Sequence, residues 1–158
     1  MKRTLLIGLL VAAGLLGRAQ PAAADITFFF GFNTGPQTSS TRGLAAGVTL
    51  LILGFEFEYA NAKENPSKLL PGLETGMFNV EVMTPTSISL YATAGGGIYR
   101  ETLGDARVTS WGTNIGGGVK FPLFGPLKVR VDYRVFNLRG NPRYNHPQRL
   151  YAGINWAF

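Results

Sequence analysis

The 158-residue sequence contains no cysteine, a single histidine and few charged side chains. The absence of cysteine excludes a disulfide framework, a cysteine-ligated metal site and a lipid-modified cysteine anchor. Charged residues make up 15% of the chain and hydrophobic residues 46%, which is an apolar composition for a soluble domain. The distribution of these apolar residues along the chain therefore decides which class of fold the sequence predicts.

A hydrophobic run long enough to cross a bilayer is also missing. The apolar run at residues 5–16 is shorter than the roughly 20 residues that a membrane-spanning helix needs. It follows the basic pair Lys2 and Arg3 and precedes the small residues 22–24, an arrangement typical of a cleaved secretory signal peptide. We therefore interpret residues 1–24 as a signal peptide, with a short core helix as the alternative for the apolar run.

Removal of the signal peptide leaves residues 25–158, with twelve basic and nine acidic side chains and a net charge of +3. This weak excess does not indicate a nucleic-acid partner. The mature segment remains apolar although it contains no candidate membrane-spanning helix. A membrane β-barrel resolves this conflict, because its apolar residues occupy alternate positions of several short strands.

Turn residues divide the mature segment into eight stretches that have the length and alternating polarity of strands. The predicted strands are residues 26–33, 43–52, 54–62, 75–83, 87–100, 108–121, 127–138 and 148–158. Long polar connections (34–42, 63–74, 101–107, 139–147) alternate with tight ones (53–54, 84–86, 122–126). We therefore predict an all-β domain at 25–158, an eight-stranded antiparallel up-and-down transmembrane β-barrel with both termini in the periplasm.

The two faces of these strands differ in polarity. One face is apolar at nearly every step, as at Phe28, Phe30 and Phe32, and we assign it to lipid. The other face is small, hydroxylated or charged, and we predict that its four acids and four bases form a luminal ion-pair cluster: Glu56, Glu58, Glu81, Asp132, Lys120, Lys128, Arg130 and Arg134. Periodicity alone does not establish which face points inward, so a soluble calycin-like barrel with an apolar ligand cavity remains an alternative.

Two glycine triads, residues 95–97 and 116–118, lie within predicted strands. A phosphate-binding loop would require a helix after the glycines, and neither triad is followed by a helical pattern. We predict that the missing side chains give room inside the barrel for long residues from other strands. A hairpin turn near Ala106 would place the triads opposite one another. A flat patch on the lipid face, for an acyl chain or a second barrel, is the functional alternative.

The last predicted strand ends on an aromatic residue. Residues 150–158 alternate apolar with small or polar side chains and finish at Phe158. This strand resembles the insertion signal of outer-membrane β-barrel proteins, and we assign the signal to Tyr151, Trp156 and Phe158. The resemblance implies that the barrel-assembly machinery is a partner during biogenesis.

Residues 26–158 as a whole resemble the small eight-stranded bacterial outer-membrane β-barrel family, the type of outer-membrane protein X and of the transmembrane barrel of outer-membrane protein A. The resemblance is architectural, without a subfamily fingerprint. It implies an integral outer-membrane protein that contacts membrane lipid and lipopolysaccharide and has no cofactor. The expected function is non-enzymatic: support of envelope integrity, or interaction of the surface loops with an external partner that the sequence does not identify.

Three other functions remain as alternatives. A narrow transport pathway is disfavoured, because eight strands leave an interior just wide enough for side chains. A lipid A-modifying enzyme would use a histidine with a serine near the outer rim, where His146, Ser110 and the hydroxyl run 38–41 all lie. Their spacing marks no nucleophile, so we predict a solvated loop histidine and no catalytic or metal-binding residues. Lipid binding by a soluble barrel is the third alternative.

Basic residues gather around the last predicted loop, at Arg139, Arg143 and Arg149. The planar guanidinium of arginine matches a phosphate group with two parallel hydrogen bonds. The outer leaflet of an outer membrane would be rich in phosphorylated lipopolysaccharide. These three residues are therefore candidate contacts for lipopolysaccharide phosphates, with an ordinary charged rim as the alternative.

Overall fold

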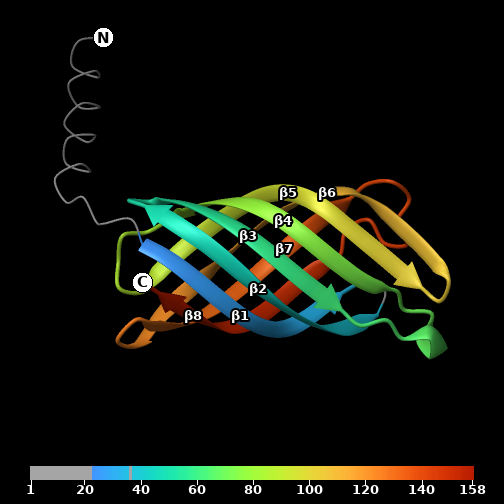
Figure 1. Ribbon diagram of the computed structural model, residues 1–158, viewed down its shortest axis with the longest axis horizontal. Coiled ribbons are helices and arrows are strands. Elements are labelled where there is room, and N and C mark those ends of the chain that lie inside the picture. Colours follow the sequence, from blue (N-terminus) through green and yellow to red (C-terminus); the bar gives the residue numbers. More distant parts are fainter. Residues whose placement is uncertain (1–22, 36) are drawn as a thin grey trace, which may run out of the picture.

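Eight strands close into an antiparallel barrel in which each strand pairs with its neighbours in sequence and β1 pairs with β8 (Figure 1). The computed structural model describes residues 23–35 and 37–158. The strands are β1 (Ala23–Thr34), β2 (Thr38–Leu50), β3 (Leu53–Ala62), β4 (Gly72–Met83), β5 (Ser89–Leu103), β6 (Ala106–Phe124), β7 (Leu127–Leu138) and β8 (Gln148–Ala157), with a short 3-10 helix, η1 (Pro66–Lys68), before β4. The predicted eight-stranded up-and-down barrel is confirmed.

The predicted signal peptide lies almost entirely outside the described residues. Only its last two residues, Ala23 and Ala24, are described, and both already belong to β1. Within the described residues, no helix is long and apolar enough to cross a membrane.

The two ends of the barrel differ in what they carry (Figure 1). The start of β1 and the C-terminus lie at one end, here called the terminus end, and η1 and the β5–β6 hairpin lie at the opposite, loop end. The terminus end holds the connections 51–52, 84–88 and 125–126, and the loop end holds 35–37, 63–71, 104–105 and 139–147. Gly104 and Gly125 have φ values of 58° and 56°, which glycine adopts without strain in such tight turns.

Two loop-end connections are much shorter than the sequence predicts. The polar run 38–41 pairs with residues 31–34, which leaves only residues 35–37 between β1 and β2. Likewise, β5 and β6 extend until only Gly104 and Asp105 connect them. The part of a strand that projects beyond the hydrocarbon of the membrane can carry polar residues on both faces. The composition of such a strand end therefore resembles that of a loop. The β3–β4 and β7–β8 connections remain as the longer loops.

Burial alternates along the strands, with apolar side chains outside and polar side chains inside. Phe28 is 66% exposed and Ile115 is 65% exposed, whereas Thr27, next to Phe28 in the chain, is fully buried. The apolar face assigned to lipid therefore points outward. The alternative of a soluble barrel with an apolar interior is wrong, because the interior receives the polar face.

The interior changes character along the barrel axis. Its middle and its terminus end hold charged and polar side chains, while an apolar cluster fills the lumen near the loop end. The members of this apolar cluster are Ala62, Leu73, Met77, Tyr99, Phe136 and Leu138. The apolar cluster therefore lies on the loop-end side of the polar centre, and Asn33 continues the polar lining to the loop end beside it.

The inward-facing glycines make room for long luminal side chains, as the sequence predicts. A methyl group at Gly116 would lie 2.9 Å from Cγ of Arg134, and one at Gly118 would lie 2.5 Å from the hydroxyl oxygen of Tyr91. Both contacts are tighter than side-chain carbons tolerate. These two glycines therefore accommodate side chains from β7 and β5.

The glycine triads do not face one another across the β5–β6 hairpin. Gly96 pairs with Thr113, and Gly117 pairs with Ala92. The turn lies at residues 104–105 instead of near Ala106, and this shift changes every pair in the hairpin. The predicted opposition of the triads is therefore wrong.

We expect Gly95→Ala to lower the free energy of unfolding by about 1–3 kcal/mol, the usual cost of overpacking an interior. The added methyl group would point inward and overlap Asn79 and the backbone of Phe78. Gly96→Ala in the same triad is the matched control, because its methyl group would lie no closer than 3.5 Å to another atom. Urea unfolding of the refolded variants in lipid vesicles measures the difference. Equal midpoints for the two variants would contradict the packing role.

Candidate functional site

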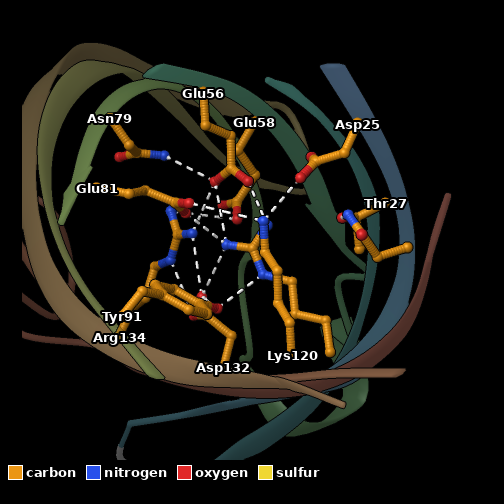
Figure 2. A network of polar contacts seen from close by, with 12 residues as sticks. Asp25, Thr27, Glu56, Glu58, Asn79, Glu81, Tyr91, Lys120, Asp132 and Arg134 are labelled. Atoms are coloured by element: carbon orange, nitrogen blue, oxygen red, sulfur yellow. Dashed lines mark hydrogen bonds and ion pairs between the residues drawn. The ribbon is translucent and has the colours of Figure 1, made fainter. Parts of the chain in front are cut away.

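Charged side chains from six strands meet inside the barrel (Figure 2). They occupy inward positions, which recur at every second residue of a strand. In Figure 2 the carboxylates of Glu56, Glu81 and Asp132 point from the barrel wall toward basic groups in the interior. Five carboxylates and four cations make up this luminal network: Asp25, Glu56, Glu58, Glu81, Asp132, Lys120, Arg130, Arg134 and Arg149.

Arg130 on β7 binds three carboxylates of the luminal network. Its guanidinium donates hydrogen bonds to Glu56, to Oε1 of Glu81 at 2.8 Å and to Oδ2 of Asp132 at 3.1 Å. Its Nε donates to the hydroxyl of Tyr91 at 2.7 Å, and that hydroxyl donates to Asp132. The Arg130 side chain is completely buried, so these contacts replace its hydration.

Glu58 connects the remaining two arginines. Its Oε2 lies 3.3 Å from Nη1 of Arg134, and its Oε1 accepts a hydrogen bond from Nη1 of Arg149 at 2.7 Å. Arg149 also donates to Oδ1 of Asn33 at 3.0 Å and to Oγ1 of Thr75 at 2.9 Å. Arg134 reaches back to Glu56 at 2.9 Å, so the ion pairs form one continuous chain along the lumen.

Lys120 extends the luminal network toward the terminus end. Its Nζ lies 2.8 Å from Oδ2 of Asp25 and 3.8 Å from Oε2 of Glu81. Lys128, which the sequence also assigns to the cluster, is half-buried beside it. Among residues 23–35 and 37–158, no carboxylate lies within 4.0 Å of the Lys128 side chain, so it is not part of the luminal network. Instead it lines a cavity of about 410 Å³ at the terminus end, together with Asp25 and Lys120.

Arg149 requires a correction. The sequence places it with the rim arginines as a lipopolysaccharide contact, but the structure buries it completely in the lumen. Arg149 pairs with Arg134 on β7 and shares the inward parity of Tyr151 and Asn155 on β8. The alternation of the strand was the signal that could have identified it. Asp25 lies one residue before the predicted strand 26–33, and extending the alternation from Thr27 by one step identifies it as inward-facing.

The luminal network closes the barrel. Arg130, Arg134 and Arg149 have no exposed side-chain surface: Arg130 and Arg134 lie on β7 with Asp132 between them, and Arg149 lies opposite Arg134 on β8. An eight-stranded barrel has an interior just wide enough for side chains. The network therefore fills the middle of the lumen with side chains and ties six strands to one another.

The rim residues predicted from sequence are solvent-exposed, except for Arg149. Arg139 and Arg143 are exposed near the β7–β8 connection, and Cζ of Arg139 lies 5.8 Å from the ring centroid of Trp111. His146 is exposed on the same connection. These side chains are therefore available to groups outside the barrel.

The C-terminal strand closes the barrel against β1. The backbone N–H of Phe158 donates to Ala24 at 2.8 Å, and that of Ala24 donates to Phe158 at 3.0 Å. Trp156 and Phe158 are exposed on the outside, whereas Tyr151 is buried and stacks on Phe29 at 4.0 Å between ring centroids. The three residues assigned to the insertion signal therefore divide between the two faces.

A cavity of about 300 Å³ opens at the loop end. The apolar cluster contributes Leu73 and Leu138, and the loops contribute Leu70 and Tyr144. Glu101 and Asn33 add polar groups to its lining, and no sequence motif pointed to them. The combination of apolar walls with a few polar groups is typical of a small-molecule pocket.

Comparison with known proteins identifies the fold alone. No protein-family model matches the chain, and a search of the curated proteins finds no match. Among solved structures, neisserial surface protein A, from Neisseria, matches with a TM-score of 0.70 and 18% identity over 89% of this chain and 99% of that chain. The N-terminal β-barrel domain of Pseudomonas aeruginosa OprF matches with a TM-score of 0.66 and 14% identity over 89% and 100%.

A third structure is that of Ail, the attachment invasion locus protein of Yersinia pestis, in complex with the heparin analogue sucrose octasulfate. It matches with a TM-score of 0.52 and 12% identity over 88% of this chain and 100% of that chain. The chain therefore has the fold of the small eight-stranded outer-membrane β-barrels. Of the three structures named here, neisserial surface protein A has the highest TM-score with this chain.

Proposed function

We propose that the mature chain is an integral outer-membrane protein without catalytic activity. Its barrel supports the integrity of the cell envelope and presents two loops, 63–71 and 139–147, to the exterior. Both termini face the periplasm, because outer-membrane barrels place short turns on that side and longer loops outside. The barrel-assembly machinery inserts it through the C-terminal strand.

The continuous apolar belt on the outside of the barrel carries this proposal. Large apolar side chains are exposed on all eight strands, including Phe30, Phe57, Phe78 and Trp111. An exposed apolar surface of this extent is unfavourable in water and marks a membrane or protein contact. Because apolar side chains are exposed on every strand, the partner must contact the barrel on all sides, and the lipid of a bilayer does so.

The closed lumen supports a structural role over transport or catalysis. The arginines of the luminal network and the carboxylates that they bind lie outside both cavities, which disfavours a water-filled path and a reactive group that a substrate could reach in the middle of the barrel. Buried charges of this kind are costly to rearrange. A rigid barrel is the property that this arrangement supplies.

The exposed rim arginines support a contact with lipopolysaccharide. Arg139 and Arg143 lie at the loop end, where the phosphates of an outer leaflet would surround the barrel. Their guanidinium groups are suited to phosphate binding. This proposal retains two of the three arginines selected from the sequence and omits Arg149.

Fractionation of cells that express the full chain tests the membrane location. We expect the barrel in the outer-membrane fraction, folded by the criterion of heat-modifiable migration, and cleavable by external protease within residues 63–71. The matched control carries Pro in the apolar run 5–16 to block export. Recovery of the mature chain as a soluble periplasmic protein would overturn the proposal.

Deletion of Phe158 tests the role of the C-terminal strand. We expect assembly in cells to fall severely, while refolding of the purified chain in micelles changes much less, because the deletion removes only one exposed side chain and the last two backbone hydrogen bonds between β8 and β1. The measurement compares the heat-modifiable fraction in the two settings. Trp156→Ala is the control for the loss of an aromatic ring at the interface. Equal damage to refolding and to assembly would mean that Phe158 is only a packing residue.

A further inference from the structure

The loop-end cavity has a chemistry that the proposed function does not use. We propose that it binds a small amphipathic ammonium compound, whose charged group pairs with Glu101 and whose hydrocarbon part packs on Leu73 and Leu138. The inference goes beyond the proposed function, because it depends on the folded barrel and not on the membrane that holds it.

Glu101 supplies the negative charge. It is the one carboxylate of β5, it faces inward near the loop end of that strand, and only 9% of its surface is exposed. Its Oε2 accepts a hydrogen bond from the backbone N–H of Arg143 at 3.0 Å. In the part of the chain that the structure describes, no lysine or arginine side chain lies within 4.0 Å of this carboxylate. Glu101 differs in this respect from every carboxylate of the luminal network.

Glu101 has exchanged most of its hydration for one neutral hydrogen-bond donor and has no countercharge, which is costly for a buried carboxylate. A cation that enters the cavity restores the missing interaction, so the site favours a positively charged ligand. The side chain of Arg143 also lines the cavity, but it is exposed and its charge is screened by water. The carboxylate is therefore the charge that a desolvated ligand contacts.

Asn33 provides a second polar group in the same lining. Its Oδ1 accepts a hydrogen bond from Arg149, and only 6% of the residue is exposed. Within residues 23–35 and 37–158, its Nδ2 has no hydrogen-bond partner. This nitrogen is itself buried, so Asn33 contributes a polar wall to the cavity, and the carboxylate of Glu101 is the group that a ligand contacts.

The remainder of the cavity fits a short hydrocarbon chain. Leu73 and Leu138 are buried members of the apolar cluster, and Leu70 lies in the wall. The volume of about 300 Å³ is at the lower end of small-molecule pockets. Charge at one side and apolar surface at the other together define an amphipathic ligand.

Three probes of equal chain length test the proposal: hexylammonium, hexanol and hexanoate. Each is titrated into the refolded barrel in lipid nanodiscs, with leucine methyl groups observed by NMR. We expect saturable shifts at Leu73 and Leu138, with hexylammonium bound about tenfold more tightly than hexanol, because a charge-assisted hydrogen bond replaces a neutral one. Hexanoate should give no saturable shift at these leucines.

Two carboxylate variants separate the site from general attraction of cations. Glu101→Gln should abolish the preference for hexylammonium, whereas Glu64→Gln, an exposed loop carboxylate outside the cavity lining, should retain it. Leu70→Ala should weaken the binding of hexylammonium and hexanol alike. If Glu101→Gln does not refold, the order of the three probes on the unaltered barrel still decides the question.

Equal affinity for the three probes would overturn the proposal. Shifts restricted to outward-facing leucines such as Leu90 and Leu150 would also overturn it, because they would show partition into the bilayer only. Neither result bears on the membrane location, which fractionation tests independently.

Discussion

Arg130→Ala is expected to destabilise the barrel by about 3–5 kcal/mol, because it leaves buried carboxylates without their partner. Three acids, Glu56, Glu81 and Asp132, share the Arg130 guanidinium, and all three are almost completely buried. The luminal network already holds five carboxylates against four cations, so the loss of one cation increases an existing imbalance. Unfolding in denaturant, after refolding into lipid vesicles, measures the change.

Two further arginine variants make this experiment specific. Arg143→Ala removes an exposed loop arginine and should change stability by no more than about 0.5 kcal/mol, as expected for a surface substitution. Arg130→Lys keeps the charge but loses the planar fork that reaches several acids at once, so its effect should fall between the other two. Equal unfolding midpoints for Arg130→Ala and Arg143→Ala would contradict a water-poor, charge-paired lumen.

Val80→Arg should destabilise the membrane-inserted barrel by about 2–4 kcal/mol, the cost of an arginine on the lipid face near the bilayer midplane. Val80 points outward from β4, between Phe78 and Val82 on the same face. The arginine introduced by Val80→Arg would therefore be surrounded by the hydrocarbon of the membrane. The same unfolding assay in vesicles measures the cost, and Val131→Arg on β7 provides an independent second site.

Thr34→Arg is the control for the lipid-face experiment. Thr34 is exposed at the loop end of β1, where an added arginine stays in water and should cost little. Unchanged stability for both Val80→Arg and Val131→Arg would mean that this face does not contact lipid. The proposed membrane location would then fail together with the face assignment.

Some members of the luminal network could be selected from sequence and others could not. Glu56 and Arg130 can be identified from the sequence because they lie in strands whose alternation of apolar and polar residues is clear on both sides. Arg149 was assigned to the rim, because it lies among polar loop residues and only its parity with Tyr151 marks it as inward. Lys128 has the inward parity of the cluster, but in the part of the chain that the structure describes no carboxylate lies within 4.0 Å of its side chain.

The ends of the strands are also difficult to predict from the sequence. Composition predicts loops at 63–74 and 139–147, and the structure has connections at 63–71 and 139–147, whereas residues 38–41 have the composition of a loop and form part of β2. A strand that extends out of the hydrocarbon no longer needs an apolar face, so the signal that defines it disappears. The backbone pairing of β1 and β2 continues through residues 38–41, because the N–H and C=O groups of the backbone form these hydrogen bonds whatever the polarity of the side chains.

Alternating polarity, by itself, determined that this chain forms eight strands with one apolar face, because the period of two is a local property of the extended backbone. Only the tertiary structure decided that the apolar face points outward, and which charges meet. Glu58 and Arg149 are separated by 91 residues and are joined by the stagger of strands around the closed barrel. The loop-end cavity has the same origin, because its walls come from the ends of several strands, whose relative heights depend on closure of the whole sheet.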